Sequence, residues 1–251
     1  MVNTLNKTVI VGATSAIAEH CARQWLQQGP AELWLVGRDA ARLQRVADDL
    51  QVRSPSSTLR VLTLGFDDPQ AIAALLRRCC EGRAPQRVLI AHGLLPDQAA
   101  CQQDLQQAAQ ALWVNGNSAV LLAEGFAGAM QRAGGGCLGV IGSVAGDRGR
   151  KSNYVYGAAK GLVERYLQGL QHRLAGTAVR VVLIKPGPTD TPMTARLRAQ
   201  GRALASVEQV AADAVRGMAR GRAVVYTPGR WRWVMAVVRA LPRALFHKLE
   251  V

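Results

Sequence analysis

A tyrosine and a lysine stand four residues apart in the segment Tyr156-Gly-Ala-Ala-Lys160. In an α-helix this spacing places both side chains on one face. A phenol has an ordinary pKa of about 10 and is a poor acid or base at neutral pH. A neighbouring ammonium and a nicotinamide cation would lower that pKa. The pair could therefore pass a proton to or from a carbonyl oxygen.

Two further polar residues precede this pair in the chain. Ser143 follows the apolar run 137–141, and the ends of parallel strands are where such folds assemble their sites. Its hydroxyl could hold the carbonyl oxygen beside the Tyr156 hydroxyl. Asn115 lies within a helical segment, where an amide is mildly unfavourable unless it has a partner. We therefore predict a carbonyl-reducing site built from Asn115, Ser143, Tyr156 and Lys160; the neighbouring Tyr154 is the weaker proton donor, because its i+4 partner is an alanine.

Short apolar runs alternate with segments of helical length along almost the whole chain. The runs cover residues 7–11, 32–36, 59–64, 87–91, 137–141, 179–184 and 223–226. Continuous apolar runs are typical of parallel strands that are buried on both faces. The alternation predicts a single-domain α/β fold, a Rossmann-like, doubly wound parallel sheet of about seven strands with helices on both faces. We expect a catalytic domain over residues 1–229 and a C-terminal amphipathic extension of the same domain over residues 230–251.

The turn after the first run is built from small residues, starting at Gly12 and continuing through Thr14, Ser15, Ala16 and Ile17. Small residues let the backbone approach a pyrophosphate at the N-terminus of the next helix. Only Gly12 remains of the three glycines that are usual in such a turn, so an ordinary tight turn is the alternative.

The residues after the second run bear on the choice of dinucleotide. Gly37 occupies the position where enzymes that prefer NAD carry a carboxylate, and Arg38 follows it. A guanidinium can pair with a 2′-phosphate. The pattern favours NADP(H), with NAD(H) as the alternative, and Asp39 is expected to cap the next helix.

The order and spacing of Asn115, Ser143, Tyr156 and Lys160, together with the motif Pro186-Gly187, resemble the short-chain dehydrogenase/reductase family. The resemblance extends from Thr8 to about Pro192. It implies that Tyr156 is the general acid/base and that Lys160 holds the nicotinamide ribose and lowers the tyrosine pKa. It also implies that Ser143 orients the carbonyl and that Asn115 holds a water of a proton relay.

The same resemblance implies a dinucleotide site; no metal site is expected, because none of the five cysteines forms a C-x-x-C pair. The expected residues of the dinucleotide site are Gly12, Thr14, Ser15, Ala16, Ile17, Arg38, Phe66, Asp67, Ala91, Gly93, Tyr156, Lys160, Pro186, Gly187, Thr189 and Thr191. Two positions depart from the family pattern at the adenine end, because Ala91 replaces an asparagine and Gly65 replaces an aspartate. His92, between Ala91 and Gly93, is interpreted as structural.

Three less generic stretches, residues 92–95, 143–156 and 231–249, resemble one branch of this family, the decaprenylphospho-β-D-erythro-pentofuranosid-2-ulose 2-reductases. This resemblance implies a role in cell-wall biosynthesis: reduction of a C2 ketone on a lipid-phospho-pentose, after a partner oxidase has begun the epimerisation. Another carbonyl substrate, such as a 3-oxoacyl thioester or a xenobiotic ketone, is the alternative within the enzyme class. A non-catalytic NAD(P)-binding regulator is the alternative outside it. The family resemblance also implies a homodimer or homotetramer.

The chain carries a net charge of +14, and its C-terminal segment mixes cations with apolar bulk. The cations are Arg230, Arg232, Arg239, Arg243 and Lys248. Such a segment can lie in a membrane interface with its arginines on lipid phosphates, or it can pack on the domain or on a second subunit. Pro242 should divide it into two helices.

The charge has further implications for ligands and location. Arg148, Arg150 and Lys151 form a basic loop that suits a phosphate-bearing substrate, with a solvated loop as the alternative. No nucleic-acid partner is expected, because no recognisable binding motif accompanies the charge. We expect a cytoplasmic protein, with peripheral contact to the inner face of the membrane.

Overall fold

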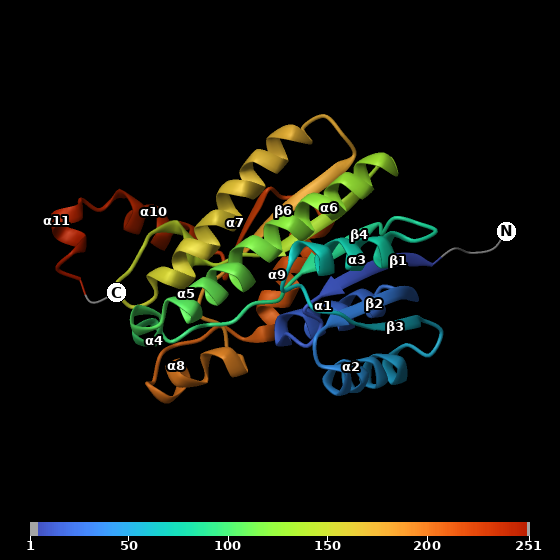
Figure 1. Cartoon of the computed structure of the whole chain (residues 1–251), viewed down its shortest axis with the longest axis horizontal. Helices are drawn as coiled ribbons and strands as arrows, with labels where there is room; N and C mark the ends of the chain where they lie inside the picture. Colours follow the sequence, from blue (N-terminus) through green and yellow to red (C-terminus); the bar gives the residue numbers. More distant parts are fainter. Residues whose placement is uncertain (1–4, 250–251) are drawn as a thin grey trace.

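The apolar runs form seven parallel strands within residues 5–249, the part of the chain that the computed structural model describes (Figure 1). Their order across the sheet is β3-β2-β1-β4-β5-β6-β7. The strand bounds are β1(Asn6–Val11), β2(Ala31–Gly37), β3(Thr58–Thr63), β4(Arg87–Ile90), β5(Gly136–Ile141), β6(Val179–Pro186) and β7(Val224–Thr227). The predicted doubly wound parallel sheet is confirmed, with each strand close to its predicted position.

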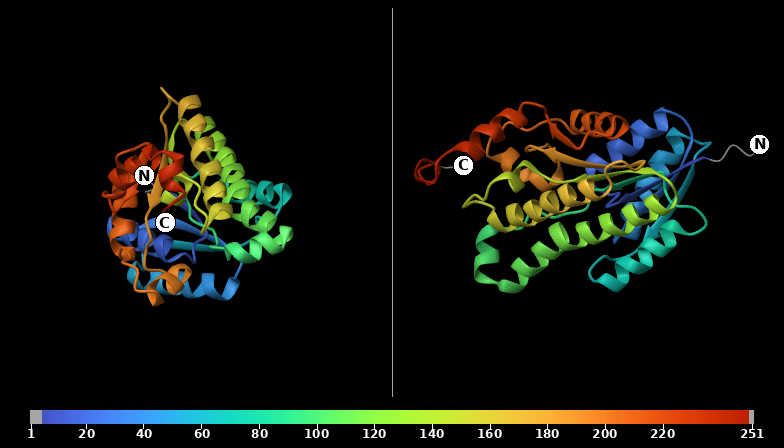
Figure 2. Two further views of the ribbon diagram at one scale, coloured as in Figure 1. Left: turned by 90° about the vertical axis from the view of Figure 1, so that its left-hand side faces the viewer. Right: turned by 90° about the horizontal axis from the view of Figure 1, so that it is seen from above.

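Helices cover both faces of this sheet, as the two views in Figure 2 show. One core lies under α1(Ala16–Gln27), α2(Ala40–Arg53) and α9(Val207–Ala219). The other lies under α3(Pro69–Cys80), α6(Ser118–Arg132) and α7(Tyr154–Arg173). Within β1, Ile10 faces the first core, while Val9 and Val11 face the second. Burial on both faces is the physical reason for the continuous apolar runs.

The strand register aligns the carboxyl ends of the central strands. Val11 pairs with Val36 on one side and with Ile90 on the other, so β1, β2 and β4 end together. The chain reverses its direction of winding between β1 and β4. In an open α/β sheet, the crevice beyond the strand ends at such a point is where ligands bind.

Shorter elements surround this edge of the sheet. They are α4(Gln98–Gln103), α5(Leu105–Leu112), the π-helical turn η1(Trp113–Asn117), η2(Val144–Asp147), η3(Pro192–Thr194) and α8(Ala195–Ala199). As expected, Asp39 caps α2, because its carboxylate accepts a hydrogen bond from the Arg42 N–H at 3.0 Å.

The C-terminal segment forms two short helices, α10(Trp231–Ala240) and α11(Arg243–Phe246), which Pro242 separates as predicted. They lie at the end of the molecule where α7 begins (Figure 1), and α10 packs against η2. Residues 250 and 251 of the predicted 230–251 extension lie outside the described residues. Within residues 5–249, none of the helices is both long enough and apolar enough to cross a bilayer.

Candidate active site

Three of the predicted catalytic side chains meet where β5 ends and α7 begins. Ser143 comes two residues after the end of the strand and caps η2, where its Oγ accepts a hydrogen bond from the Ala145 N–H at 3.1 Å. Tyr156 and Lys160 lie on the first two turns of α7. A hydrogen bond joins the side chains of Ser143 and Tyr156, and the Lys160 ammonium lies 5.8 Å from the centre of the Tyr156 ring. The structure therefore brings together a hydroxyl, a phenol and an ammonium.

The pKa of Tyr156 in this structure is governed by burial. Loss of hydration around the phenolate raises the pKa of this phenol above its ordinary value, and the hydrogen bond with Ser143 offsets only part of the rise. Tyr156 is therefore protonated at neutral pH. The predicted lowering by the Lys160 ammonium together with a nicotinamide cation concerns the protein with its dinucleotide bound and stays a prediction.

Lys160 is almost fully buried, with 4 % of its surface exposed. Its Nζ donates a hydrogen bond to the Ile141 carbonyl at 3.0 Å. Burial lowers the pKa of Lys160 from 10.5 to about 8. The ammonium is thus only marginally favoured at neutral pH and can give up a proton readily.

Asn115 finds the partners that its position in a helix requires. It is fully buried in the π-helical turn η1, where its Oδ1 accepts a hydrogen bond from the Leu94 N–H at 2.9 Å. Its Nδ2 donates to the Ala111 carbonyl at 3.0 Å. A Cβ placed on Gly93 would contact both Asn115 Oδ1 and Lys160 Nζ, at 2.9 and 3.8 Å. Asn115 and Lys160 therefore both lie beside Gly93, which connects Asn115 to the other candidate catalytic residues.

The turn between β1 and α1 provides a cradle of the kind that a dinucleotide requires. Gly12 has a φ of +80°, and a Cβ at this position would overlap the backbone nitrogen of His92. Thr14, Ser15 and Ala16 are partly exposed at the N-terminus of α1, whereas the Ile17 side chain is buried. Free N–H groups at a helix N-terminus bind phosphate oxygens. This turn therefore fits a pyrophosphate.

Two arginines lie beside this cradle. The exposed Arg38 follows β2, and its guanidinium lies 5.8 Å from the centre of the Phe66 ring. Arg42, which the sequence reasoning missed, donates a hydrogen bond from Nη2 to the Thr14 carbonyl at 3.3 Å. The only feature of the sequence that could have indicated Arg42 is its position one helical turn after Arg38. Both cations are available to a 2′-phosphate.

The expected adenine-end residues differ in what they can offer to a nucleotide. The Phe66 side chain is buried and packs against His92, with 4.3 Å between the ring centres and an angle of 44° between the rings, and the Phe66 carbonyl accepts a hydrogen bond from Trp113 Nε1 at 3.0 Å. Asp67 is exposed, and Ala91 is buried at the end of β4. His92 Nε2 is 2.8 Å from Ser118 Oγ. Burial lowers the pKa of His92 to about 3, so its ring is neutral and has the properties of a structural residue.

The Pro186-Gly187 motif ends β6 at the same edge of the sheet. Thr189 is buried, and its Oγ1 donates a hydrogen bond to the Gly187 carbonyl at 2.9 Å, while the Thr191 N–H donates to Thr194 at 3.1 Å. A Cβ on Gly187 would overlap the indole of Trp231. The first residue of α10 therefore packs directly on this motif.

The basic loop between Ser143 and Tyr156 uses two of its three cations, Arg148 and Arg150, in contacts within the chain. The Arg148 Nη1 group donates to the carbonyls of Val238 and Leu241, at 2.7 Å for the latter, and its guanidinium lies 3.8 Å from the centre of the Phe246 ring. Arg150 Nη2 is 3.5 Å from the sulfur of Met235. The two arginines hold the C-terminal helices, because the last carbonyls of α10 need donors.

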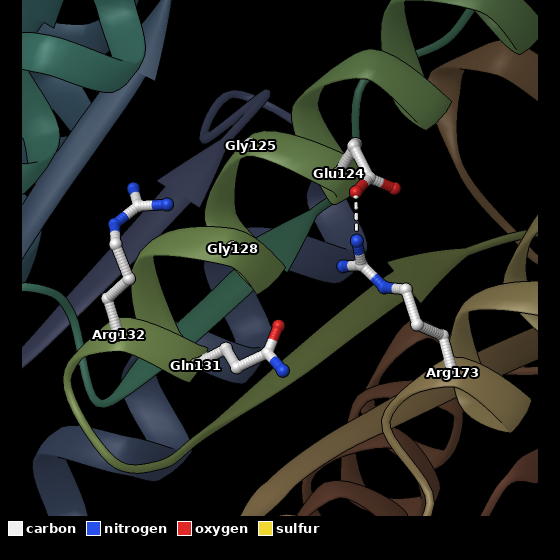
Figure 3. Close-up of a pocket in the computed structure, with 6 residues that line it drawn as sticks. All are labelled: Glu124, Gly125, Gly128, Gln131, Arg132 and Arg173. Carbon is white, nitrogen blue, oxygen red and sulfur yellow. Dashed lines mark ion pairs between the residues drawn. The ribbon is translucent and has the colours of Figure 1, made fainter.

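A separate hollow lies between α6 and α7, away from these residues (Figure 3). It is lined by Glu124, Gly125, Gly128, Gln131, Arg132 and Arg173. Arg173 forms an ion pair with Glu124 across it, at 2.7 Å. The predicted site residues are not part of this hollow.

Comparison with known proteins identifies the family. Residues 6–202 match the family model for short chain dehydrogenases. The chain belongs to the short-chain dehydrogenase family. It is 34% identical over 245 residues to an uncharacterized oxidoreductase of Streptomyces coelicolor, covering 97% of this chain and 95% of that protein.

Solved structures of the family share the fold. A short-chain dehydrogenase from Sphingobium yanoikuyae in complex with NADPH superposes with a TM-score of 0.82 and 24% identity, covering 96% of this chain and 98% of that one. A bulky-bulky ketone specific alcohol dehydrogenase from Comamonas testosteroni gives a TM-score of 0.80 and 23% identity, covering 96% and 97%. The chain is thus an oxidoreductase of a family that works with nicotinamide dinucleotides.

Proposed function

We propose that this short-chain dehydrogenase reduces a ketone with NADPH, using Tyr156 as the proton donor. The observation that carries the proposal is the hydrogen bond between Ser143 and Tyr156 beside the buried Lys160. Two hydroxyls side by side can both bind one carbonyl oxygen. When bound, the reduced dinucleotide would supply the hydride, and the residues of this chain would handle the proton.

The raised pKa of Tyr156 suits the direction of reduction. A phenol that stays protonated at neutral pH can donate its proton to the oxygen that becomes negative as the ketone is reduced. Ser143 would hold the same oxygen in place. Lys160, with a pKa of about 8, would bind ribose hydroxyls and return a proton toward Tyr156. Asn115 would hold the backbone around Gly93 in place beside Lys160.

NADP(H) is the favoured cofactor, and NAD(H) is the alternative. Arg38 and Arg42 both lie where a 2′-phosphate would meet the end of β2. The related Sphingobium protein was solved with NADPH. The backbone from Gly12 to Ala16 would hold the pyrophosphate, and the Pro186–Thr191 segment would hold the nicotinamide amide.

For the substrate, we propose the C2 ketone of a lipid-phospho-pentose, reduced after a partner oxidase has formed it. The sequence resemblance to the 2-ulose reductases supports this substrate, and so does the exposed side of the C-terminal helices. Another ketone, such as a 3-oxoacyl thioester, is the alternative. A regulator without turnover would have no need of the Ser143, Tyr156 and Lys160 set.

The C-terminal helices present an apolar and cationic surface, which we call the tail surface. Its apolar residues include Trp233, which is 71% exposed, and Val237, which is 63% exposed. The full set is Trp233, Val234, Val237, Leu245 and Leu249, with Arg230, Arg232, Arg239, Arg243 and Lys248 among them, and residues 230–249 contain no Asp or Glu. On the other side of α10, Met235 is fully buried. The tail surface therefore suits an anionic membrane, beside the end of the sheet where the catalytic residues lie.

A homodimer or homotetramer is also proposed. Four exposed leucines lie on the neighbouring elements α5, α6 and α7: Leu105, Leu112, Leu121 and Leu162. Apolar side chains that gather on one face of a soluble protein commonly mark a protein interface. Light scattering of the wild type and of a Leu105→Glu, Leu162→Glu variant tests this, and a monomeric wild type contradicts it.

One assay tests the substrate. NADPH oxidation is followed with a lipid-phospho-2-ketopentose, with a 3-oxoacyl thioester and with a small cyclic ketone, each with and without anionic vesicles. We expect the lipid-phospho-ketopentose to give the highest kcat/KM, and only in the presence of vesicles or detergent. Preference for the thioester or the cyclic ketone would refute the substrate proposal while leaving the reductase intact.

A second assay tests the membrane contact. Changing Arg239, Arg243 and Lys248 to Gln should release the protein from anionic vesicles, because each cation near such a surface contributes about 1 kcal/mol. The matched control changes three exposed arginines elsewhere, Arg77, Arg132 and Arg220, to Gln. Wild-type protein that stays in the supernatant at low and at high salt would show that the tail surface serves packing or assembly.

A further inference from the structure

A buried ammonium lies directly behind the active site. Lys185 is on β6, immediately before Pro186-Gly187, and only 1% of its surface is exposed. Its Nζ forms ion pairs with Asp147 and with Glu164, the latter at 2.6 Å, and lies 5.0 Å from the centre of the Tyr226 ring. The Tyr226 hydroxyl donates a hydrogen bond to Asp147 Oδ2 at 2.9 Å. We call these four residues the Lys185 network.

Each charged member of the network stands close in the chain to a residue of the site. Lys185 is two residues before Gly187, and Asp147 is four residues after Ser143. Glu164 is four residues after Lys160 on α7, so it lies one turn further along the same helix face. Tyr226 is paired with Lys185 in the register of β6 and β7. The network thus joins the three chain segments that carry the site.

Stability alone is a poor reason for this arrangement. The Asp147 side chain is fully buried, and taking two carboxylates and an ammonium out of water costs more than an apolar core of the same volume. A fully paired buried network does, however, hold its members in one arrangement, because any displacement leaves a charge without its partner. The burial of Lys185 disfavours its charge, but the two carboxylates more than compensate, so the pKa of Lys185 is raised.

We propose that Lys185 is a positioning residue. Its ion pairs hold the Ser143 loop, the middle of α7 and the Pro186-Gly187 turn at the spacing that orders the nicotinamide end of a bound dinucleotide. This role does not depend on which substrate the protein reduces, because it requires only that the chain binds a dinucleotide. The adenine end lies at β1 and β2, at Gly12 and Arg38, and the network does not extend to it.

The test compares two ligands that differ in the nicotinamide. NADPH carries it, whereas 2′,5′-ADP carries only the adenosine half with its 2′-phosphate. In a Lys185→Met variant, we expect NADPH to bind about tenfold more weakly, equivalent to about 1.4 kcal/mol, and 2′,5′-ADP to bind as in the wild type. The emission of bound NADPH should also move toward that of free NADPH, which reports directly on the nicotinamide. No ketone is needed, so the result does not depend on the substrate.

A matched control separates positioning from stability. Met130 is fully buried and packs beside Gly136 at the start of β5, at the opposite end of the strand from Ser143. Met130→Ala should lower the unfolding midpoint in urea without changing the affinity of either ligand. If Lys185→Met weakens both ligands equally, or neither, the positioning role is overturned.

A milder variant covers the case in which Lys185→Met does not fold. Tyr226→Phe removes only the hydroxyl that donates to Asp147. It should weaken NADPH by about threefold, a fraction of one hydrogen bond, and leave 2′,5′-ADP unchanged. Equal affinities of this variant and the wild type for NADPH would overturn the proposal on their own.

Discussion

Replacing Lys160 by methionine should stabilise the dinucleotide-free protein at neutral pH while abolishing turnover. The pKa of this buried lysine is lowered from 10.5 to about 8. Each unit of pKa corresponds to about 1.4 kcal/mol, so at neutral pH the protonated lysine costs the folded state about 3 kcal/mol. Methionine also leaves the Ile141 carbonyl without its donor, at a cost of about 1 kcal/mol. The expected net gain is about 2 kcal/mol.

The pH dependence of this gain has a definite sign. Between pH 8 and pH 10.5 the unfolded chain keeps the Lys160 proton that the folded chain has released. Because the unfolded state then binds more protons, the stability of the wild type rises with pH across this window. Methionine carries no proton, so its advantage should shrink through the window and reverse at its upper end.

Urea unfolding followed by circular dichroism at pH 7 and at pH 10.5 measures both effects. Lys248→Met is the control, because it removes one exposed cation and changes the net charge equally. A wild type that is more stable than Lys160→Met at pH 7, or a difference that does not vary with pH, would refute the reasoning. Either result would mean that water hydrates this ammonium, or that a counter-ion pairs with it, in the folded protein.

Three further substitutions test other parts of the site. Tyr156→Phe should lower turnover by a factor of about 10²–10⁴ and leave the affinity for NADPH, measured by fluorescence titration, unchanged. Turnover within about fivefold of wild type would show that another residue donates the proton, and Tyr154 would be the next candidate. Arg38→Ala should weaken NADPH relative to NADH by about 1.5–3 kcal/mol in calorimetry, and equal losses would show that it does not contact the 2′-phosphate. Arg148→Ala should speed hydrogen exchange in α10, because the carbonyls of Val238 and Leu241 lose their donor; unchanged exchange would contradict its anchoring role.

Local patterns were sufficient to predict the sheet and to select candidate catalytic residues that the fold brings together. Strands buried on both faces must be apolar throughout, so the seven runs were readable without knowing their neighbours. Tyr156 and Lys160 share a helix face through their spacing alone. Asp39 and Pro242 act within one turn of their own positions, and the structure confirms both. In each case the physical cause lies within a few residues of the residue itself.

Other features depend on residues that are distant in the chain. Arg148 contacts carbonyls about 90 residues later, so an arginine of the loop that suggested phosphate binding holds the C-terminal helices. The pKa of Tyr156 depends on how deeply the fold buries the phenol, which the spacing of Tyr156 and Lys160 does not reveal.

Lys185 is the clearest case of this kind. In the sequence it is one lysine directly after an apolar run, and its two carboxylate partners lie 38 and 21 residues away. Electrostatic energies depend on distance and on exclusion of water, and both quantities exist only once the strands and helices have packed. For the same reason, sequence patterns can suggest charged side chains for a site, but packing decides which charges are paired and which remain available to a ligand.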